Sequence, residues 1–436
     1  MRLNDILKNK VVGNAGWIIG GKVFNKALAF VVGILSARYL GPGNYGLINY
    51  AAAYTAFFAS LCTLGINSVL VKELIDYPEK EGETLGTTLV MRAASSMLSA
   101  VMIICITLFA DRDEPLTILV VALYSVGMIF QVYDAFNYWF QAKLRSKYQA
   151  IAENIAFIVV SAFKILLLVL QKDVRWFAVA GSIDYITAAV ILFAAYKKNG
   201  GPKLSFSWNR GKEILSVSSH FIISGLMVSI YASTDRFMLK QMLSEEVVGY
   251  YSLASSLSVS WAFVLAAIID SMCPVIVQSR KENYKEYEQK NRILYAIVFY
   301  AALAASALIC IFAKPIVEIL YGTKYIPAIE PLRIIVWYTA FSYLGVARNP
   351  WMVCENKQKY LKYIYIGAAV INVLLNALLI PNFGAAGAAG AAGASLVTQM
   401  ATTVVLPFAI PALRPNAKLM VEAVCFKGVF NRKNKS

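Results

Sequence analysis

The feature that most constrains this chain is a succession of apolar runs, each about 20 residues long, that continues along the whole sequence. A run of that length crosses the hydrocarbon core of a bilayer as an α-helix, which satisfies every backbone polar group internally. Only 15% of the residues are charged, against about 25% in an average soluble domain. The sequence therefore predicts an all-α integral membrane protein with twelve spans, near residues 14–37, 44–66, 86–110, 115–138, 149–171, 174–196, 214–240, 247–272, 292–313, 331–353, 359–381 and 387–411.

The distribution of positive charge predicts how these spans are oriented. The chain has 41 Lys and Arg against 25 Asp and Glu, and most basic residues fall in alternate connecting segments. Because cytoplasmic segments are enriched in Lys and Arg, we expect both termini to be cytoplasmic in a multi-pass protein of the cytoplasmic membrane. No soluble domain carries a basic patch, so no nucleic-acid partner is expected.

The spans divide into two halves around the longest connection. We expect a six-helix lobe in each half, and the stretch from Leu40 can be laid over that from Met242 so that Gly46 matches Gly249. Since six is an even number, both halves start on the same side, and a parallel repeat around a central cavity is predicted. The expected divisions are an N-terminal lobe at 1–196, a cytoplasmic loop at 197–212, a C-terminal lobe at 213–411, and a basic cytoplasmic tail at 412–436 that lies at the anionic lipid surface.

Motifs for other chemistries are absent or misplaced. The six cysteines are scattered through apolar runs, which indicates packing and predicts neither disulfides nor a metal site. No Walker A sequence occurs, so ATP hydrolysis through that motif is excluded. The "DRD" at Asp111–Asp113 falls in an expected outer loop and is interpreted as a solvated turn. We therefore predict no enzymatic activity and no cofactor, apart from coupling to H⁺ or Na⁺.

Several Gly-rich membrane stretches, weak singly, occur in an order that resembles a known family. They include "NKALAFVVGILSARYLGPGNYGLINY", "LGINSVLVKEL", "NYWFQAKLRSKYQAIAENI", "STDRFMLKQMLSEEVVGYYSLASSL", "LYGTKYIPAIEPLRII" and "IPNFGAAGAAGAAGASLVTQ". Over the whole chain this order is similar to the Wzx-type oligosaccharide flippases, in the superfamily that also contains MATE exporters and the lipid II flippase.

The resemblance implies a function. It implies transfer of an undecaprenyl-diphosphate-linked oligosaccharide from the cytoplasmic to the outer leaflet, for O-antigen, capsule or exopolysaccharide biosynthesis. It also implies alternating access driven by an ion gradient, and glycan polymerases and glycosyltransferases as partners.

Two alternatives remain from the residues themselves. A MATE-like exporter of cationic small molecules should show an excess of carboxylates in its spans, whereas cations are in excess here. A glycan polymerase or ligase would be expected to have a large outer loop, which the predicted spans do not leave room for.

Basic residues inside the predicted spans are the candidates for substrate contacts. A charge at the centre of a membrane helix costs roughly 2.5–3.5 kcal/mol on insertion scales, so such residues need a function or a partner. Lys22 and Lys26 share one helix face with Asn25 beside them, and we expect this face to attract the diphosphate or acidic sugars. The alternative is that a lysine snorkels or pairs with a carboxylate such as Asp134. The full set comprises Lys22, Lys26, Arg92, Lys164, Arg236 and Arg348.

Two further spans carry polar stripes. Asp235, beside Arg236, is the candidate for the ion-coupling carboxylate, because buried carboxylates in transporters relay protons or bind sodium; a structural Asp235–Arg236 pair is the alternative. On the fourth span, Gln131 and Asp134 are candidates for sugar or ion contacts, or for hydrogen bonds between helices.

The other polar positions have simpler interpretations. Arg92 is expected to reach the cytoplasmic headgroups. Arg348 precedes Pro350, which predicts a broken span with a gate or hinge, or alternatively a place at the cytoplasmic interface. The repeat "GAAGAAGAAG" at 384–393 is interpreted as close helix packing.

Overall fold

The structure, a computed structural model, describes residues 10–383 and 386–425, with the side chains of 10–24, 68, 220, 223 and 224 left out of the description. Its described residues form helices and no β-strand, which confirms the predicted all-α class. Eight helical segments in this part of the chain are long and apolar enough to cross a membrane: Pro78–Ala110, Pro115–Ala142, Lys147–Val169, Val174–Lys198, Phe263–Glu282, Tyr284–Ile311, Gln358–Asn382 and Gly387–Ala409. A multi-pass membrane protein follows, while the number twelve and the side of the termini remain predictions.

The chain divides into two units by the contacts within each. The first unit comprises Met1–Leu40 and Tyr54–Leu226, and the second comprises Gly41–Ala53 and Met227–Ser436. This division does not test the lobe boundaries expected from the sequence, which remain predictions.

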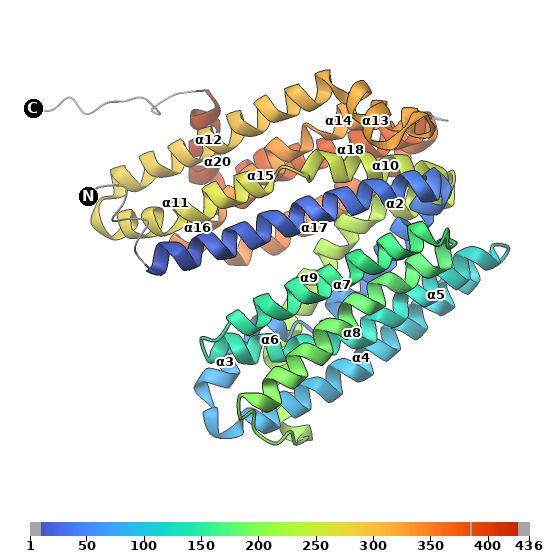
Figure 1. Cartoon of the computed structure of the whole chain (residues 1–436). Coiled ribbons are helices and arrows are strands. Elements are labelled where there is room, and N and C mark those ends of the chain that lie inside the picture. Colours follow the sequence, from blue (N-terminus) through green and yellow to red (C-terminus); the bar gives the residue numbers. More distant parts are fainter. Residues whose placement is uncertain (1–9, 384–385, 426–436) are drawn as a thin grey trace, which may run out of the picture. The chain divides into compact units, whose positions relative to one another are not determined.

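The first unit is a bundle in which α4, α5, α7 and α8 lie side by side (Figure 1). Its elements, with α2 and α9 shared between the two units, are α2 (Lys10–Thr63), α3 (Asn67–Asp76), η1 (Pro78–Lys80), α4 (Glu81–Ala110), α5 (Pro115–Phe130), η2 (Gln131–Asp134), α6 (Ala135–Ala142), α7 (Lys147–Val169), α8 (Val174–Lys198) and α9 (Trp208–Met242).

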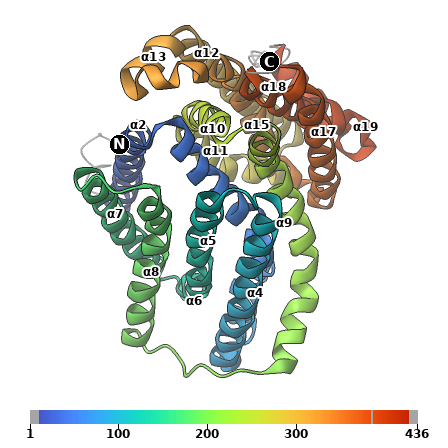
Figure 2. The same cartoon turned by 90° about the vertical axis from the view of Figure 1, so that its right-hand side faces the viewer.

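The second unit pairs α11 with α12 and α17 with α18, and the latter two lie side by side in Figure 2. Its further elements are α10 (Glu245–Val259), α11 (Phe263–Glu282), α12 (Tyr284–Ile311), α13 (Ala313–Tyr321), η3 (Thr323–Ala328), α14 (Ile329–Ile335), α15 (Tyr338–Ala347), α16 (Asn349–Cys354), η4 (Gln358–Tyr360), α17 (Leu361–Asn382), α18 (Gly387–Met400), η6 (Ala401–Val405), α19 (Leu406–Ala409), η7 (Pro411–Leu413) and α20 (Arg414–Val424).

The first two predicted spans lie in the single helical segment α2. It is interrupted at Gly41, whose φ of 71° and ψ of 172° are not helical, and Pro42 follows. Glycine adopts a positive φ without the steric cost of a Cβ, and proline supplies no N–H to continue the ladder. The "LGPGN" between the predicted spans is therefore a kink between two helices.

The glycines matched in the sequence repeat contact each other in the second unit. A Cβ added to Gly46 would lie 2.7 Å from the backbone nitrogen of Gly249, and one added to Gly249 would lie 2.1 Å from the carbonyl oxygen of Pro42. The start of the second predicted span therefore packs directly on α10, with no space for a side chain at either glycine.

A second repeat is visible in the backbone. α6 and α16 end in the same turn, with Leu144 (φ 55°) and Asn356 (φ 54°) in the left-handed region. The bond from Arg145 N to Phe140 O is 2.8 Å, and that from Lys357 N to Met352 O is also 2.8 Å. These two turns are Schellman motifs that place Trp139 and Trp351, both buried, at equivalent positions. In this register Phe136 of the first unit corresponds to Arg348 of the second.

The small residues of the "GAAGAAGAAG" stretch pack tightly where they are described. Ala388, Ala389, Ala391 and Ala392 on α18 are buried, and a Cβ on Gly390 would lie 2.9 Å from the carbonyl oxygen of Leu379 on α17. The packing interpretation is confirmed for these residues.

Candidate functional site

The carboxylate of Asp235 on α9 is the centre of a buried polar cluster in the second unit. Asp235 is only 5% exposed. Its Oδ2 accepts hydrogen bonds from the Tyr251 hydroxyl of α10 and the Ser395 hydroxyl of α18. Its Oδ1 accepts from the amides of Asn376 (2.6 Å) and Asn372 (3.1 Å), which lie one turn apart on α17. Four helices thus converge on one carboxylate.

All four donors to Asp235 are neutral. Arg236, the next residue, is turned elsewhere: its Nε lies 3.3 Å from the Ser252 hydroxyl and its Nη1 lies 3.4 Å from the Ala232 carbonyl. Among the ion pairs of the described residues, none joins Asp235 to a cation. The Asn376 Oδ1 is buried without a partner among the described residues, so the amide that donates to Asp235 also carries an unused hard oxygen acceptor. Chemically, this cluster is suited to hold Na⁺ or a proton.

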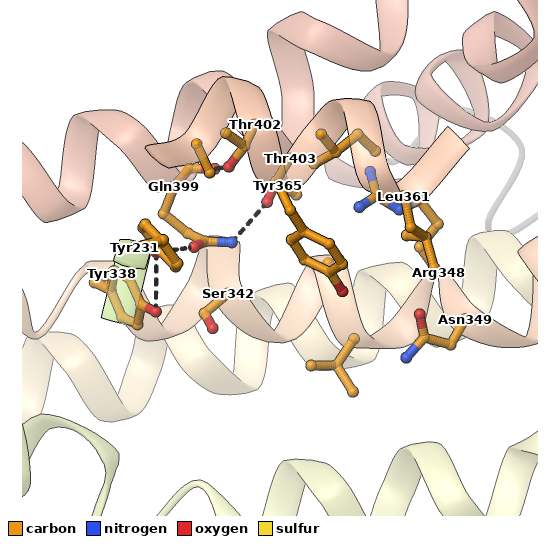
Figure 3. A pocket seen from close by; sticks show the side chains of 14 residues that line it. Tyr231, Tyr338, Ser342, Arg348, Asn349, Leu361, Tyr365, Gln399, Thr402 and Thr403 are labelled. Carbon is orange, nitrogen blue, oxygen red and sulfur yellow. Dashed lines mark hydrogen bonds between the residues drawn. The ribbon is translucent and has the colours of Figure 1, made fainter. Parts of the chain in front are cut away.

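A pocket lies next to this cluster, and α9 and α18 contribute residues to both. Tyr231 precedes Asp235 by one turn of α9, and Gln399 follows Ser395 by one turn of α18. The Tyr231 hydroxyl lies 2.5 Å from Gln399 Oε1 and 3.1 Å from the Tyr338 hydroxyl. The amide of Gln399 donates to the Thr403 hydroxyl at 3.0 Å. Figure 3 shows these bonds at one end of the pocket and Arg348 with Asn349 at the other.

The pocket is a cavity of about 170 Å³. None of its lining residues is acidic, and most of the polar ones carry hydroxyl groups or amides. They are Tyr231, Tyr338, Ser342, Gly345, Val346, Arg348, Asn349, Leu361, Ile364, Tyr365, Ala368, Gln399, Thr402 and Thr403.

Prolines shape the backbone around this pocket. Pro350 separates α15 from α16 at Arg348, as the sequence predicts for a broken span. At the other side, α18 passes into the π-helical turn η6, which carries Thr402 and Thr403. Pro407 lacks the N–H that would bond the carbonyl of Thr403 in a regular α-helix. A π-turn of this kind often marks a functional site.

Arg348 is buried in this wall of the pocket. It is 4% exposed, and its Nε and Nη1 have no partner among the described residues. It therefore lies inside the second unit, while its depth in the membrane, within the span or at the cytoplasmic interface, remains a prediction. The electrostatic neighbours of its guanidinium are Tyr295 on α12 and Tyr365 on α17.

The candidate residues near the N-terminus are only partly described. Lys22 lies on α2, but its side chain is outside the described part of the chain. The Asn25 amide donates to Asn154 Oδ1 of α7, and Lys26 is exposed. The expectation that these residues line a cavity remains a prediction.

Lys164 on α7 lies near a carboxylate that is not among the site residues predicted from the sequence. Asp184 on α8 interacts with it electrostatically, although no ion pair joins the two. Glu153, on the same face of α7 as Lys164 but three turns away, accepts a bond of 2.8 Å from the Gln149 amide. The proximity of Lys164 to Asp184 becomes apparent only when α7 and α8 are packed together, so the sequence does not predict it.

Gln131 and Asp134 of η2 lie beside Arg92 of α4. The Arg92 Nη2 donates to the backbone oxygen of Gln131 at 3.2 Å, and Asp134 interacts with Arg92 electrostatically. Asp134 Oδ1 also accepts from the Asn137 amide at 3.2 Å. The expectation that Arg92 reaches the headgroups is wrong, because Arg92 is 1% exposed. Its distance along the span had suggested the interface, but α4 begins at Glu81 and turns this side chain into the first unit.

The partners of Asp235 are not among the site residues predicted from the sequence. Asn372 and Asn376 are four residues apart in an apolar span, which is the spacing of two residues on one helix face. The sequence therefore contained a signal that could have identified these two asparagines. The choice of Tyr251 and Ser395 as donors depends on the packing of α9 against α10 and α18, which no local pattern encodes.

Comparisons with known proteins agree with this architecture. Residues 11–280 match a family described as polysaccharide biosynthesis protein. An uncharacterized membrane protein of Methanocaldococcus jannaschii is 20% identical over 414 residues, which are 87% of this chain and 80% of that protein.

Solved structures share the fold. The lipid II flippase MurJ in an inward closed conformation has a TM-score of 0.67 and 12% identity, over 96% of this chain and 94% of that one. An inward-facing multidrug resistance MATE family transporter of the MOP superfamily has a TM-score of 0.65 and 16% identity, over 91% and 96%. A MOP superfamily transporter from Pyrococcus furiosus, whose binding pocket is described as having reverse polarity, has a TM-score of 0.62 and 13% identity, over 93% and 94%.

At these identities the structures establish the fold alone, which this chain shares with MOP superfamily transporters and with the lipid II flippase, and the family match covers more than half of the chain. The protein is therefore a multi-pass membrane protein that belongs to the polysaccharide biosynthesis protein family.

Proposed function

We propose that the protein is a flippase that moves an undecaprenyl-diphosphate-linked oligosaccharide from the cytoplasmic to the outer leaflet of the cytoplasmic membrane. The product would supply O-antigen, capsule or exopolysaccharide biosynthesis, with glycosyltransferases and a glycan polymerase as partners. Family membership and the fold support transport in a polysaccharide pathway.

The observation that carries the proposal is that basic residues inside the predicted spans lack ion pairs with described carboxylates. Arg92, Lys164, Arg236 and Arg348 form no ion pair with a described carboxylate, although each lies in a predicted span. A diphosphate carries several negative charges, and a low-dielectric environment strengthens its attraction to each cation. Lys22 and Lys26 are proposed to contribute to the same attraction. Cations without an ion pair suit an anionic cargo better than a cationic one, even though Asp134 and Asp184 interact electrostatically with Arg92 and Lys164.

Ion coupling is proposed to act through Asp235. A transporter needs two states with different affinities for the ion, and a carboxylate held by four neutral donors is sensitive to whether a cation or proton joins it. Binding there would bias α9, α10, α17 and α18 towards one of two packings. The driving ion gradient would thereby be used to reset the carrier.

The test is translocation in liposomes. Purified protein would be reconstituted with a fluorescent undecaprenyl-diphosphate-linked oligosaccharide, and movement between leaflets measured by accessibility to an impermeant quencher. We expect ion-gradient-dependent flipping, and a loss of flipping in the double variant Lys22→Ala, Lys26→Ala. Full flipping in that variant at equal protein levels would contradict the role of the pair.

A MATE-like exporter is the second candidate, favoured by the fold shared with multidrug transporters. The same liposomes, loaded with a cationic dye, separate the two functions. Dye efflux without lipid translocation would replace the flippase proposal by the exporter.

A further inference from the structure

The buried guanidinium of Arg348 has no counter-charge in the second unit as described. None of the residues that line its pocket is acidic, and two of its nitrogens have no partner. An arginine does not lose its proton in a protein, so it cannot relieve this burial by neutralisation. An isolated buried charge costs several kcal/mol, and native proteins hold such charges with a partner. The pocket therefore calls for an anion from outside the described residues of the second unit.

Further hydrogen-bond donors face the same space. Ser342 on α15, Asn349 on α16 and Tyr365 on α17 line the pocket, and their side chains make no hydrogen bond within the described part of the chain. Figure 3 shows Tyr365 and Asn349 on the same side of the pocket as Arg348. A guanidinium fork is thus accompanied by neutral donors that come from three separate elements.

The fold itself does not require a cation here. Phe136 holds the equivalent position in the first unit, where it is 0% exposed and its ring centroid lies 4.6 Å from that of Tyr196. The asparagine that follows is retained in both units, as Asn137 and Asn349. The second unit therefore replaces an aromatic core residue by an arginine while keeping the same turn and the same buried tryptophan.

We infer that this pocket is a binding site for a phosphate-class oxyanion, held by the Arg348 fork and by the surrounding hydroxyl and amide donors. The two oxygens of a carboxylate lie in one plane with its carbon. A tetrahedral phosphate has three or four oxygens that point in different directions, which matches donors that come from three elements. The cavity of about 170 Å³ has room for a phosphate group.

The site is distinct from the Asp235 cluster, and the inference does not rest on the proposed function. The phosphate can be free inorganic phosphate or the terminal phosphate of a prenyl lipid, and both share the chemistry that Arg348 recognises. The pocket and the Asp235 cluster are joined by Tyr231 on α9 and Gln399 on α18.

Binding to the full-length protein in detergent tests the inference without any transport. Inorganic phosphate in one arm and farnesyl phosphate in the other would be titrated by calorimetry, with thermal unfolding as a second readout. We expect saturable binding in at least one arm. In Arg348→Phe we expect the affinity to fall at least about 30-fold, because removing one partner of a buried charge pair typically costs 2–5 kcal/mol.

The variants are chosen so that misfolding cannot imitate the result. Arg348→Phe copies the residue of the first unit, so it should be at least as stable as the wild type in the absence of phosphate. Arg348→Lys keeps the charge without the fork and should bind with intermediate affinity. Arg280→Met removes an arginine that is already paired with Glu355 at 2.9 Å and should bind normally.

Two results would overturn the inference. One is the absence of binding in both arms, which would leave the pocket filled by water alone. The other is binding that Arg348→Phe does not weaken while this variant unfolds at a much lower temperature than the wild type, which would make Arg348 a structural residue.

Discussion

At the scale of single residues, the chemistry of the second unit depends on one carboxylate and one guanidinium. Asp235 is satisfied by neutral donors, and Arg348 has no charged partner among the described residues. Adjacent charges in sequence do not pair here, because neighbouring residues on a helix point about 100° apart. Arg236 consequently bonds Ser252 while Asp235 faces α17 and α18.

The substitution Asp235→Asn tests the ion-coupling role. It keeps the size of the side chain but removes the charge, and the new amide faces two amide donors. We expect gradient-driven flipping in liposomes to fall at least about tenfold, with a loss of unfolding free energy of about 1–3 kcal/mol from the mismatched donors. Gradient-independent flipping should be affected less than gradient-driven flipping.

Asp173 provides the matched carboxylate for that experiment. It caps α8, and its hydrogen bond and attraction to Arg175 hold its pKa below the ordinary value of 3.8. Its contribution to stability is present above that ordinary pKa and is lost as the pH falls through the lowered value. Asp173→Asn preserves the cap, so transport at pH 7 should be unchanged. An equal loss of transport in both variants would show that any carboxylate change is harmful, and would remove the argument for Asp235.

At the scale of elements, prolines and glycines decide where helices break and where they touch. Gly41–Pro42 divides α2, Pro350 separates α15 from α16, and Pro407 follows the π-turn η6. Two of these breaks border the pocket of Arg348. Gly46 and Gly249 do the opposite, because they let two helices approach until only backbone separates them.

The glycine crossing gives a prediction about stability. Gly249→Ala places a methyl group 2.1 Å from the Pro42 carbonyl oxygen, which forces the helices apart. We expect a loss of about 1–3 kcal/mol in unfolding free energy, as for other overpacked contacts, measured by thermal unfolding in detergent.

Gly33→Ala is the control for that substitution. Nothing lies within 4 Å of a Cβ at Gly33 on α2, so the change should instead stabilise the helix by about 0.5–1 kcal/mol. If both alanines destabilise the protein equally, helix propensity and not the close crossing controls the result.

At the scale of the whole molecule, the distribution of charge predicts a topology that labelling can test. On a background without the six native cysteines, Asp113→Cys and Lys203→Cys place single exposed thiols in connections on opposite sides of the predicted membrane. We expect an impermeant maleimide to label Asp113→Cys in intact cells, because its loop is external. Lys203→Cys should react only after the cells are broken. Labelling of both thiols from the same side would require a different number of spans between them.

Much of the fold could be predicted because lipid imposes a simple rule. Apolar runs longer than about 18 residues must be helices, so the all-α class and the positions of most long helices follow from hydropathy. The break before Pro350 follows as well, since proline acts on the backbone locally. The residue Asp235 stands out for the same reason, because a carboxylate in an apolar run is costly wherever that run folds.

The sequence by itself thus determined the membrane class, the helical segments, their local breaks and the identity of the costly polar residues. Only the tertiary structure decided which of these residues meet. It buried Arg92, brought Asn372, Asn376, Tyr251 and Ser395 to Asp235, and left Arg348 in a pocket without a carboxylate. The reason is physical: hydropathy depends on the solvent around each segment, whereas a hydrogen bond between distant segments depends on how far each helix is rotated about its own axis, which packing alone sets.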